Sequence, residues 1–227
     1  AYFSYQHGGF PFYHSEPRET DDQTYYTLGL RWAGRAGGFA FEMEPVTQMG
    51  RVAAPHTNGK DRVIAYGGHI DLGYTLPVRT EPRLFVAYAL GSGDASPEDG
   101  RFNQFHGNVF NDNYLVGDMS VIADLSGVAV NGAFVSGIRA RVVGCSFNPR
   151  PVLNLAADYH RFSASEVPSG FSQNLGSELN AVLTWKATKN TSLLASYNRF
   201  FSGDFLRQAF GESRDIDYVY LRSSFEF

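Results

Sequence analysis

The sequence predicts an all-β protein, folded as a transmembrane antiparallel up-and-down β-barrel with about ten strands in this chain. Three observations support this prediction. Apolar and polar residues alternate in segments along the chain, the connections between these segments are short and long in turn, and the chain ends in an amphipathic strand. No run approaches the roughly 18 apolar residues that a membrane-spanning helix requires.

The alternation has a period of two, which is the period of a β-strand with two different faces. From Leu153 to Tyr159 apolar side chains occupy one face, and Asp158 and His160 belong to the other. The same separation recurs around residues 26–32, 39–44, 64–74, 84–90, 138–142 and 178–186. In a membrane barrel the apolar face contacts lipid and the polar face lines the interior.

The connections are sorted by length. Short, turn-forming stretches are expected at 33–38, 77–82, 148–151 and 187–190. Long polar stretches fall between them, at 8–23, 47–60, 93–132, 163–176 and 202–214. Short periplasmic turns and long outer loops are typical of outer-membrane barrels. The last strand places Val219, Leu221 and Phe225 on one face and ends at Phe227, in agreement with this fold.

The composition excludes several classes of function. The 227 residues carry a net charge of −4, so there is no basic surface to predict nucleic-acid binding. The one cysteine, Cys145, excludes an intramolecular disulfide and a cysteine-rich metal site. The histidines lack metal-ligand spacing. We therefore expect no metal site and no cofactor.

The chain is expected to be a single barrel domain over 1–227, with 93–132 as a long extracellular or inward-folded loop. About forty residues without a confident strand are long for a plain connection, and such loops are usually functional. The apolar content of 114–130 is compatible with an extra hairpin or a lid. Asp94, Glu98 and Asp99 offer oxygen ligands to calcium, but the irregular spacing favours a solvated surface loop.

Charged residues of the strands are expected to face the interior. The predicted cations are Arg31, Arg83, Arg139, Arg141, Lys186 and Arg222, and the predicted acids are Glu42, Glu44, Asp71, Asp158, Glu178 and Glu226. Arg139 and Arg141, with Asp158 and His160, are candidates for a constriction that attracts anions. The alternative is a salt-bridged wall, which the equal numbers of the two signs slightly favour.

Several motifs resemble the bacterial alginate-export family of outer-membrane porins. They are the stretch from Tyr88 to Asp94 followed by Phe102 and Asn103, then Ala123-Asp124-Leu125, and finally residues 153–162. The resemblance is best from Arg83 to Phe162. It implies a barrel with more strands than this chain provides and a lumen that passes an anionic polysaccharide. The chain is then either the C-terminal part of a larger barrel or a small, complete one.

The expected function is passive passage of polar solutes, anionic or saccharide, through the bacterial outer membrane, in contact with its lipid and without catalysis. One alternative is a scaffold barrel that holds a partner protein in its lumen or in the periplasm. A less favoured alternative is a hydrolase at the barrel rim, with His160, Asp158 and either Ser136 or Ser196 as a triad. A water-soluble ten-stranded barrel is the structural alternative.

Overall fold

A computed structural model describes residues 1–8, 23–53, 59–96, 98–107, 115–211 and 214–226. It contains thirteen strands and one short helix. In chain order they are β1 (Tyr2–Gly8), β2 (Gln23–Gly29), β3 (Trp32–Ala36), β4 (Phe39–Ala53), β5 (Lys60–Thr75), β6 (Arg83–Gly91), β7 (Arg101–Phe102), β8 (Gly127–Val130), β9 (Ala133–Arg150), β10 (Leu153–Glu166), β11 (Asn174–Lys186), β12 (Thr191–Ser202), α1 (Asp204–Phe210) and β13 (Ile216–Phe225).

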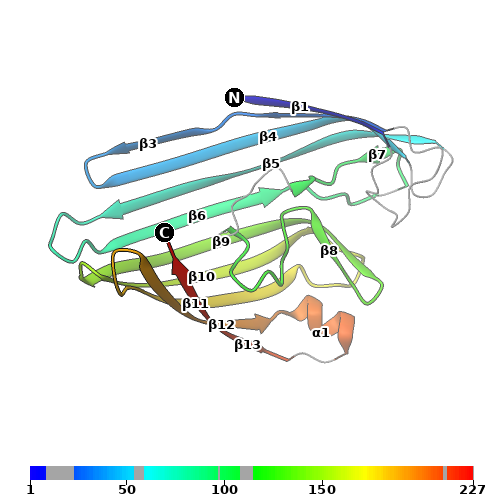
Figure 1. Ribbon diagram of the computed structural model, residues 1–227. Helices are drawn as coiled ribbons and strands as arrows, with labels where there is room; N and C mark the ends of the chain where they lie inside the picture. Colours follow the sequence, from blue (N-terminus) through cyan, green and yellow to red (C-terminus); the bar gives the residue numbers. More distant parts are fainter. Residues whose placement is uncertain (9–22, 54–58, 97, 108–114, 212–213, 227) are drawn as a thin grey trace.

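The strands form one curved sheet (Figure 1). Its main path is β1-β2-β4-β5-β6-β9-β10-β11-β12-β13, and every pair along the path is antiparallel. Neighbours on the path follow one another in the sequence, apart from the short β3, β7 and β8. The predicted all-β, up-and-down fold is confirmed. Within the described residues β1 and β13 end the path without pairing to each other. No helix in this part of the chain is long and apolar enough to cross a membrane.

The connections divide between the two ends of the sheet. Connections of two to seven residues join β5 to β6, β9 to β10 and β11 to β12 at one end, which we call the turn end. Connections of seven or more residues join β6 to β9, β10 to β11 and β12 to β13 at the other, the loop end. The stretch 33–38, predicted as a turn, is mostly β3. The reversal needs only Gly37 and Gly38, because Gly37 adopts a φ of 59° that favours glycine.

The convex face of the sheet is apolar. Alternate residues of β10, β11, β12 and β13 present Leu155, Leu183, Leu193 and Leu221 on this face, joined by strand register into one surface. Leu221 is 80% exposed and Leu183 is 39% exposed. Soluble proteins rarely leave such a continuous apolar surface open to water. The face is therefore suited to lipid.

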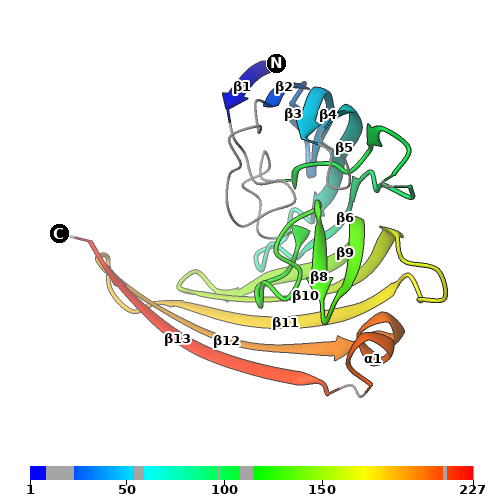
Figure 2. The same ribbon diagram turned by 90° about the vertical axis from the view of Figure 1, so that its right-hand side faces the viewer.

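Residues 92–96, 98–107 and 115–126, between β6 and β9, fold against the concave face, as Figure 2 shows from the loop end; we call them the inward segment. Phe105 of this segment is fully buried. It lies against Gly67 of β5 and Gly91 of β6, which are opposite each other in strand register. A Cβ at Gly67 would come within 2.7 Å of the Phe105 ring, so the glycine makes room for the aromatic side chain. Leu115, Ile122 and Leu125 extend the same core.

This core reverses the predicted faces of residues 138–142. Ile138, Ala140 and Val142 are buried on the concave side, and Arg139 and Arg141 point out of the convex side. The prediction that Arg139 and Arg141 face the interior is therefore wrong. Its premise was that apolar strand residues contact lipid. Here they contact the inward segment instead, and the backbone of Ile138 donates a hydrogen bond to Leu125.

Candidate functional site

The concave face gathers most of the residues predicted for the interior. Six of the eight named site residues belong to it by strand register, side-chain contacts or cleft lining: Arg31, Arg83, Asp158, His160, Lys186 and Arg222. Arg139 and Arg141 lie on the opposite face, so they do not form a rung with Asp158 and His160. Polar residues of the concave face form two groups, one on β4 and β5 and one on β10 to β12; Asp158 and His160 belong to the second, and Arg31 contacts the first.

The first group, the acidic cluster, consists of Glu42, Glu44, His69 and Asp71. Strand register places Glu42 opposite Asp71 and Glu44 opposite His69. His69 is buried, and its Nδ1 lies 2.6 Å from Asp71 Oδ2. Its Nε2 lies 3.9 Å from Glu42 and 3.8 Å from Glu44. The sequence spacing did not reveal this cluster because two strands contribute to it, and only their register brings the residues together.

Three members of the acidic cluster could hold a divalent cation. One ligand atom each from Glu42, Glu44 and His69 lies within 4.8 Å of the others, and carboxylate contact to His69 Nδ1 is typical of metal-binding histidines. However, Arg31 already contacts these carboxylates, with its Nε 2.7 Å from Glu42 and 3.9 Å from Glu44. Tyr2 donates a hydrogen bond to Glu44. In this arrangement the cluster is a salt-bridged part of the wall.

Charged clefts open on the turn side of the concave face. A cleft of about 610 Å³ lies among β3, β4, β5 and β6, and its lining includes Arg35, Glu42, Asp71 and Arg83. The Arg83 guanidinium lies over the Phe85 ring, 5.0 Å from its centre. A second cleft, of about 550 Å³, is lined by Lys186 and other residues of the tight turns. Both clefts present charges of both signs to solvent.

The second group, the amide row, crosses β10, β11 and β12. It consists of Asp158, His160, Glu178, Asn180 and Asn198. Asp158 accepts a hydrogen bond from Asn180 at 2.8 Å and contacts His160 Nε2 at 2.7 Å. His160 Nδ1, Glu178 Oε2, Asn180 Oδ1 and Asn198 Nδ2 are buried and make no hydrogen bond within the described residues. Buried polar atoms of this kind usually bond to water or a ligand.

Hydrogen bonds fasten the inward segment to both groups of strands. The buried side chain of Gln48 on β4 donates to the carbonyl of His106 and accepts from its backbone N–H, at 3.0 and 2.9 Å. Glu178 on β11 accepts from the backbone of Met119 at 3.0 Å. The segment therefore spans the concave face from β4 to β11. Sequence analysis missed Gln48 as an anchor, although its position in the inward alternation of β4 was a signal.

The acidic stretch at the start of this segment uses its carboxylates for local backbone bonds. Asp94 accepts from the backbone N–H groups of Ser96 and Asn103, and Asp99 accepts from that of Arg101. These bonds are typical of turn-forming aspartates. They give Asp94 and Asp99 a structural role in the turns. Asp94 is buried, so the expectation of a solvated surface loop does not hold at this residue.

The two serines considered for a hydrolase are held by other groups. Ser136 accepts from the Asp94 backbone and donates to Gln104, and Ser196 donates to Asn198. His160 contacts Asp158 through Nε2, and within the described residues no hydrogen bond joins its imidazole to either serine. These two serines therefore do not form a nucleophile–base pair with His160.

Burial changes the pKa of three titratable groups in the inward segment. It raises the pKa of Asp94 and, together with the nearby Asp158 carboxylate, that of Asp118. Burial lowers the pKa of His106 from its ordinary value of 6.5, and Asp124 partly opposes this shift. Below pH 3.8 both aspartates are protonated, and their contribution to the free energy of docking the segment is most favourable. This contribution is lost as the pH rises through their raised pKa, because the charged carboxylates are then buried. Above pH 6.5 the His106 imidazole is neutral and contributes favourably to the free energy of docking. This contribution is lost as the pH falls through its lowered pKa.

We expect acidification to loosen the segment through His106. Between about pH 7.5 and 5.5 a released imidazole takes up a proton more readily than the docked one, so docking weakens. Accessibility of the segment to limited proteolysis should increase over this interval. The variant His106→Gln should show a much smaller pH dependence. An unchanged dependence in that variant would assign the effect to another group.

A family model described as alginate export matches residues 6–171. The match extends beyond the stretch 83–162 on which the resemblance was based, and it confirms that resemblance. It includes the acidic cluster, the inward segment and β10, whereas β11 to β13 lie outside it. No curated protein matches the chain.

Proposed function

Because the chain belongs to the alginate export family, a family of outer-membrane transport proteins rather than enzymes, we propose that it forms an outer-membrane pore for passive passage of polar solutes. Solutes move along the concave face through a water-filled interior. The inward segment narrows this interior. Diffusion down a gradient requires no catalytic group and no cofactor.

The observation that carries this proposal is the contrast between the two faces. Leu155, Leu183 and Leu221 lie on the convex face, which suits lipid, whereas the acidic cluster and the amide row line the concave face. A channel needs this arrangement, because water and solute occupy the interior while lipid surrounds the barrel. A water-soluble sheet would place its apolar residues on the opposite side.

Carboxylates predominate in the acidic cluster and the amide row, which favours neutral or cationic solutes over anions at these two groups. Together they contain five carboxylates, and Arg31 contacts two of them, whereas the turn-side clefts carry charges of both signs. Interior charges select solutes by sign. Hydroxyl-bearing solutes such as saccharides suit the amide row, whose amide and carboxylate groups donate and accept hydrogen bonds. We therefore propose a neutral saccharide or a small cation as the solute.

Planar-bilayer recordings test the proposal. The purified protein should form ion-permeable channels, with a reversal potential in a potassium chloride gradient that indicates cation preference. The double variant Glu42→Gln, Asp71→Asn should reduce the ratio of cation to anion permeability by roughly threefold, because both carboxylates line the turn-side cleft. Arg139→Gln is the matched control. It removes one charge from the convex face and should leave selectivity unchanged.

Two results would contradict the proposal. Protein that inserts into bilayers and never conducts would exclude a pore. If such protein also co-purified with a tightly bound second polypeptide, a scaffold barrel would be the better interpretation. A selectivity change in Arg139→Gln as large as in the double variant would indicate that the faces of β9 are wrongly assigned.

A further inference from the structure

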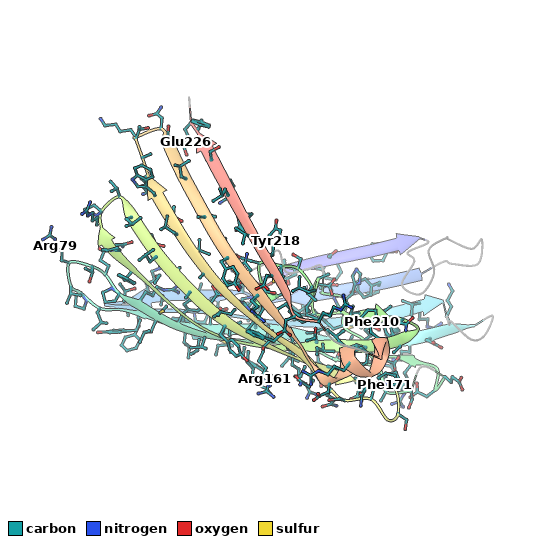
Figure 3. All side chains as sticks on the ribbon, turned by 90° about the horizontal axis from the view of Figure 1, so that it is seen from below. Arg79, Arg161, Phe171, Phe210, Tyr218 and Glu226 are labelled. Carbon is teal, nitrogen blue, oxygen red and sulfur yellow. The ribbon has the colours of Figure 1, made fainter. Side chains whose placement is uncertain are left out.

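Three arginines form a cluster on the convex face, near the loop end. Arg139 and Arg141 lie two residues apart on β9, and Arg161 on β10 is directly opposite Arg141 in strand register. Arg141 and Arg161 are exposed, and Figure 3 shows Arg161 projecting away from the sheet. Their sequence neighbours Ala140 and Phe162 are buried on the concave side. The burial of these neighbours fixes the outward direction of the arginines.

The cluster has no counter-charge of its own. Within the described residues no carboxylate lies within 4.0 Å of any of the three guanidinium groups, whereas Arg199, also on the convex face, pairs with Asp215 and Asp217. Like charges directly opposite each other on neighbouring strands destabilise a sheet. The one aromatic contact, of Arg141 with the Tyr88 ring at 5.9 Å, does not neutralise charge. An external anion would remove this repulsion.

The surroundings of the cluster determine which anion can reach it. Toward the turn end the same face continues with Val143, Tyr159 and Leu155, which suit lipid. An arginine facing the middle of a bilayer costs about 2–4 kcal/mol, whereas near the interface the cost falls to about 0–1 kcal/mol. The cluster therefore belongs at the border of the lipid-facing band. Long loops mark the external side of outer-membrane barrels, so this border faces the outer leaflet.

We propose that Arg139, Arg141 and Arg161 bind the phosphate groups of lipids in the outer leaflet. The inference rests on the proposed membrane pore. Guanidinium groups bind phosphate through two parallel hydrogen bonds, and this geometry is more selective than a single ammonium contact. Two strands hold Arg141 and Arg161 side by side, so one phosphate can contact both. The bound lipid neutralises the cluster and holds β9 and β10 at the interface.

Native mass spectrometry of the detergent-solubilised full chain tests this inference, with lipid A as the probe and its fully dephosphorylated form as the comparison. The wild type should retain the phosphorylated lipid at least about tenfold better than the dephosphorylated one. The double variant Arg141→Gln, Arg161→Gln should lose most of this difference. Arg141→Lys, Arg161→Lys keeps the charge without the paired hydrogen bonds and should show an intermediate effect. Arg83→Gln, on the concave face, is the matched control and should retain the wild-type preference.

Some results would contradict lipid binding by the arginines, and others would contradict the pore. Equal retention of the two lipids by the wild type, or an unchanged preference in the double glutamine variant, would overturn the inference. Displacement of the lipid by inorganic phosphate at millimolar concentration would overturn it in favour of a site for free phosphate. Channel recordings on the same preparations distinguish this inference from the proposed function. The glutamine variant should conduct like the wild type, whereas a wild type that neither inserts nor conducts would contradict the pore itself.

Discussion

Replacing Phe105 with alanine should increase single-channel conductance several-fold. The Phe105 ring is fully buried against β5 and β6 and anchors the inward segment there. Removing a buried phenylalanine side chain typically costs about 3–5 kcal/mol. The hydrogen bonds that Gln48 and Glu178 make with the segment do not offset a loss of this size, so the part of the segment around Phe105 should leave the concave face and widen the passage.

A second variant separates release of the segment from general misfolding. Gly67→Ala leaves Phe105 in place but introduces a Cβ 2.7 Å from its ring, so it should weaken docking and raise conductance in the same direction. Phe201→Ala is the control, because Phe201 lies on the convex face of β12. Conductance that stays at the wild-type level in both Phe105→Ala and Gly67→Ala, in folded protein, would show that the segment does not limit passage.

Leu183→Arg is expected to destabilise the protein in a membrane. Leu183 lies on the convex face between Leu155 and Ala195 in strand register, three residues before the end of β11 at the turn end. An arginine at this position lies between the bilayer midplane and the interface, so it should lower the free energy of unfolding by about 1–3 kcal/mol. Denaturant titration of the protein folded into lipid vesicles measures this loss.

Thr184→Arg is the matched control for this measurement. Thr184 is the next residue on β11 and points to the opposite, concave side, where it lines the same cleft as Lys186. Its substitution should change the unfolding free energy by less than about 1 kcal/mol. Equal losses in the two variants, or a larger loss in Thr184→Arg, would reject the assignment of the faces and with it the membrane barrel.

The strands were predictable because their pattern is local. Alternation from Leu153 to Tyr159 and around Glu178 depends only on the two-residue period of the backbone, and the structure places both stretches as expected. The order of strands followed from the alternation of short and long connections. The limits of individual elements were less predictable. Residues 204–210 form a helix inside a predicted loop, and β3 occupies most of a predicted turn.

The candidate site depended on contacts between residues far apart in the chain. His69 meets Glu44 only through the register of β4 and β5, and Gln48 meets His106 only when the segment turns inward. The sequence signalled that 93–132 is unusual through its length. It did not indicate which surface that segment covers.

The sequence by itself determined that this protein is an antiparallel up-and-down sheet with one apolar and one polar face, because the alternation is set by the backbone. Only the tertiary structure decided which way residues 138–142 point. An apolar strand face can be buried by lipid or by another part of the chain, and the period of two is the same in both cases. In this protein Phe105, Leu115 and Leu125 pack on the concave side, in one core with the apolar residues of 138–142. Arg139 and Arg141, which alternate with those residues, therefore lie on the convex face and not in the interior.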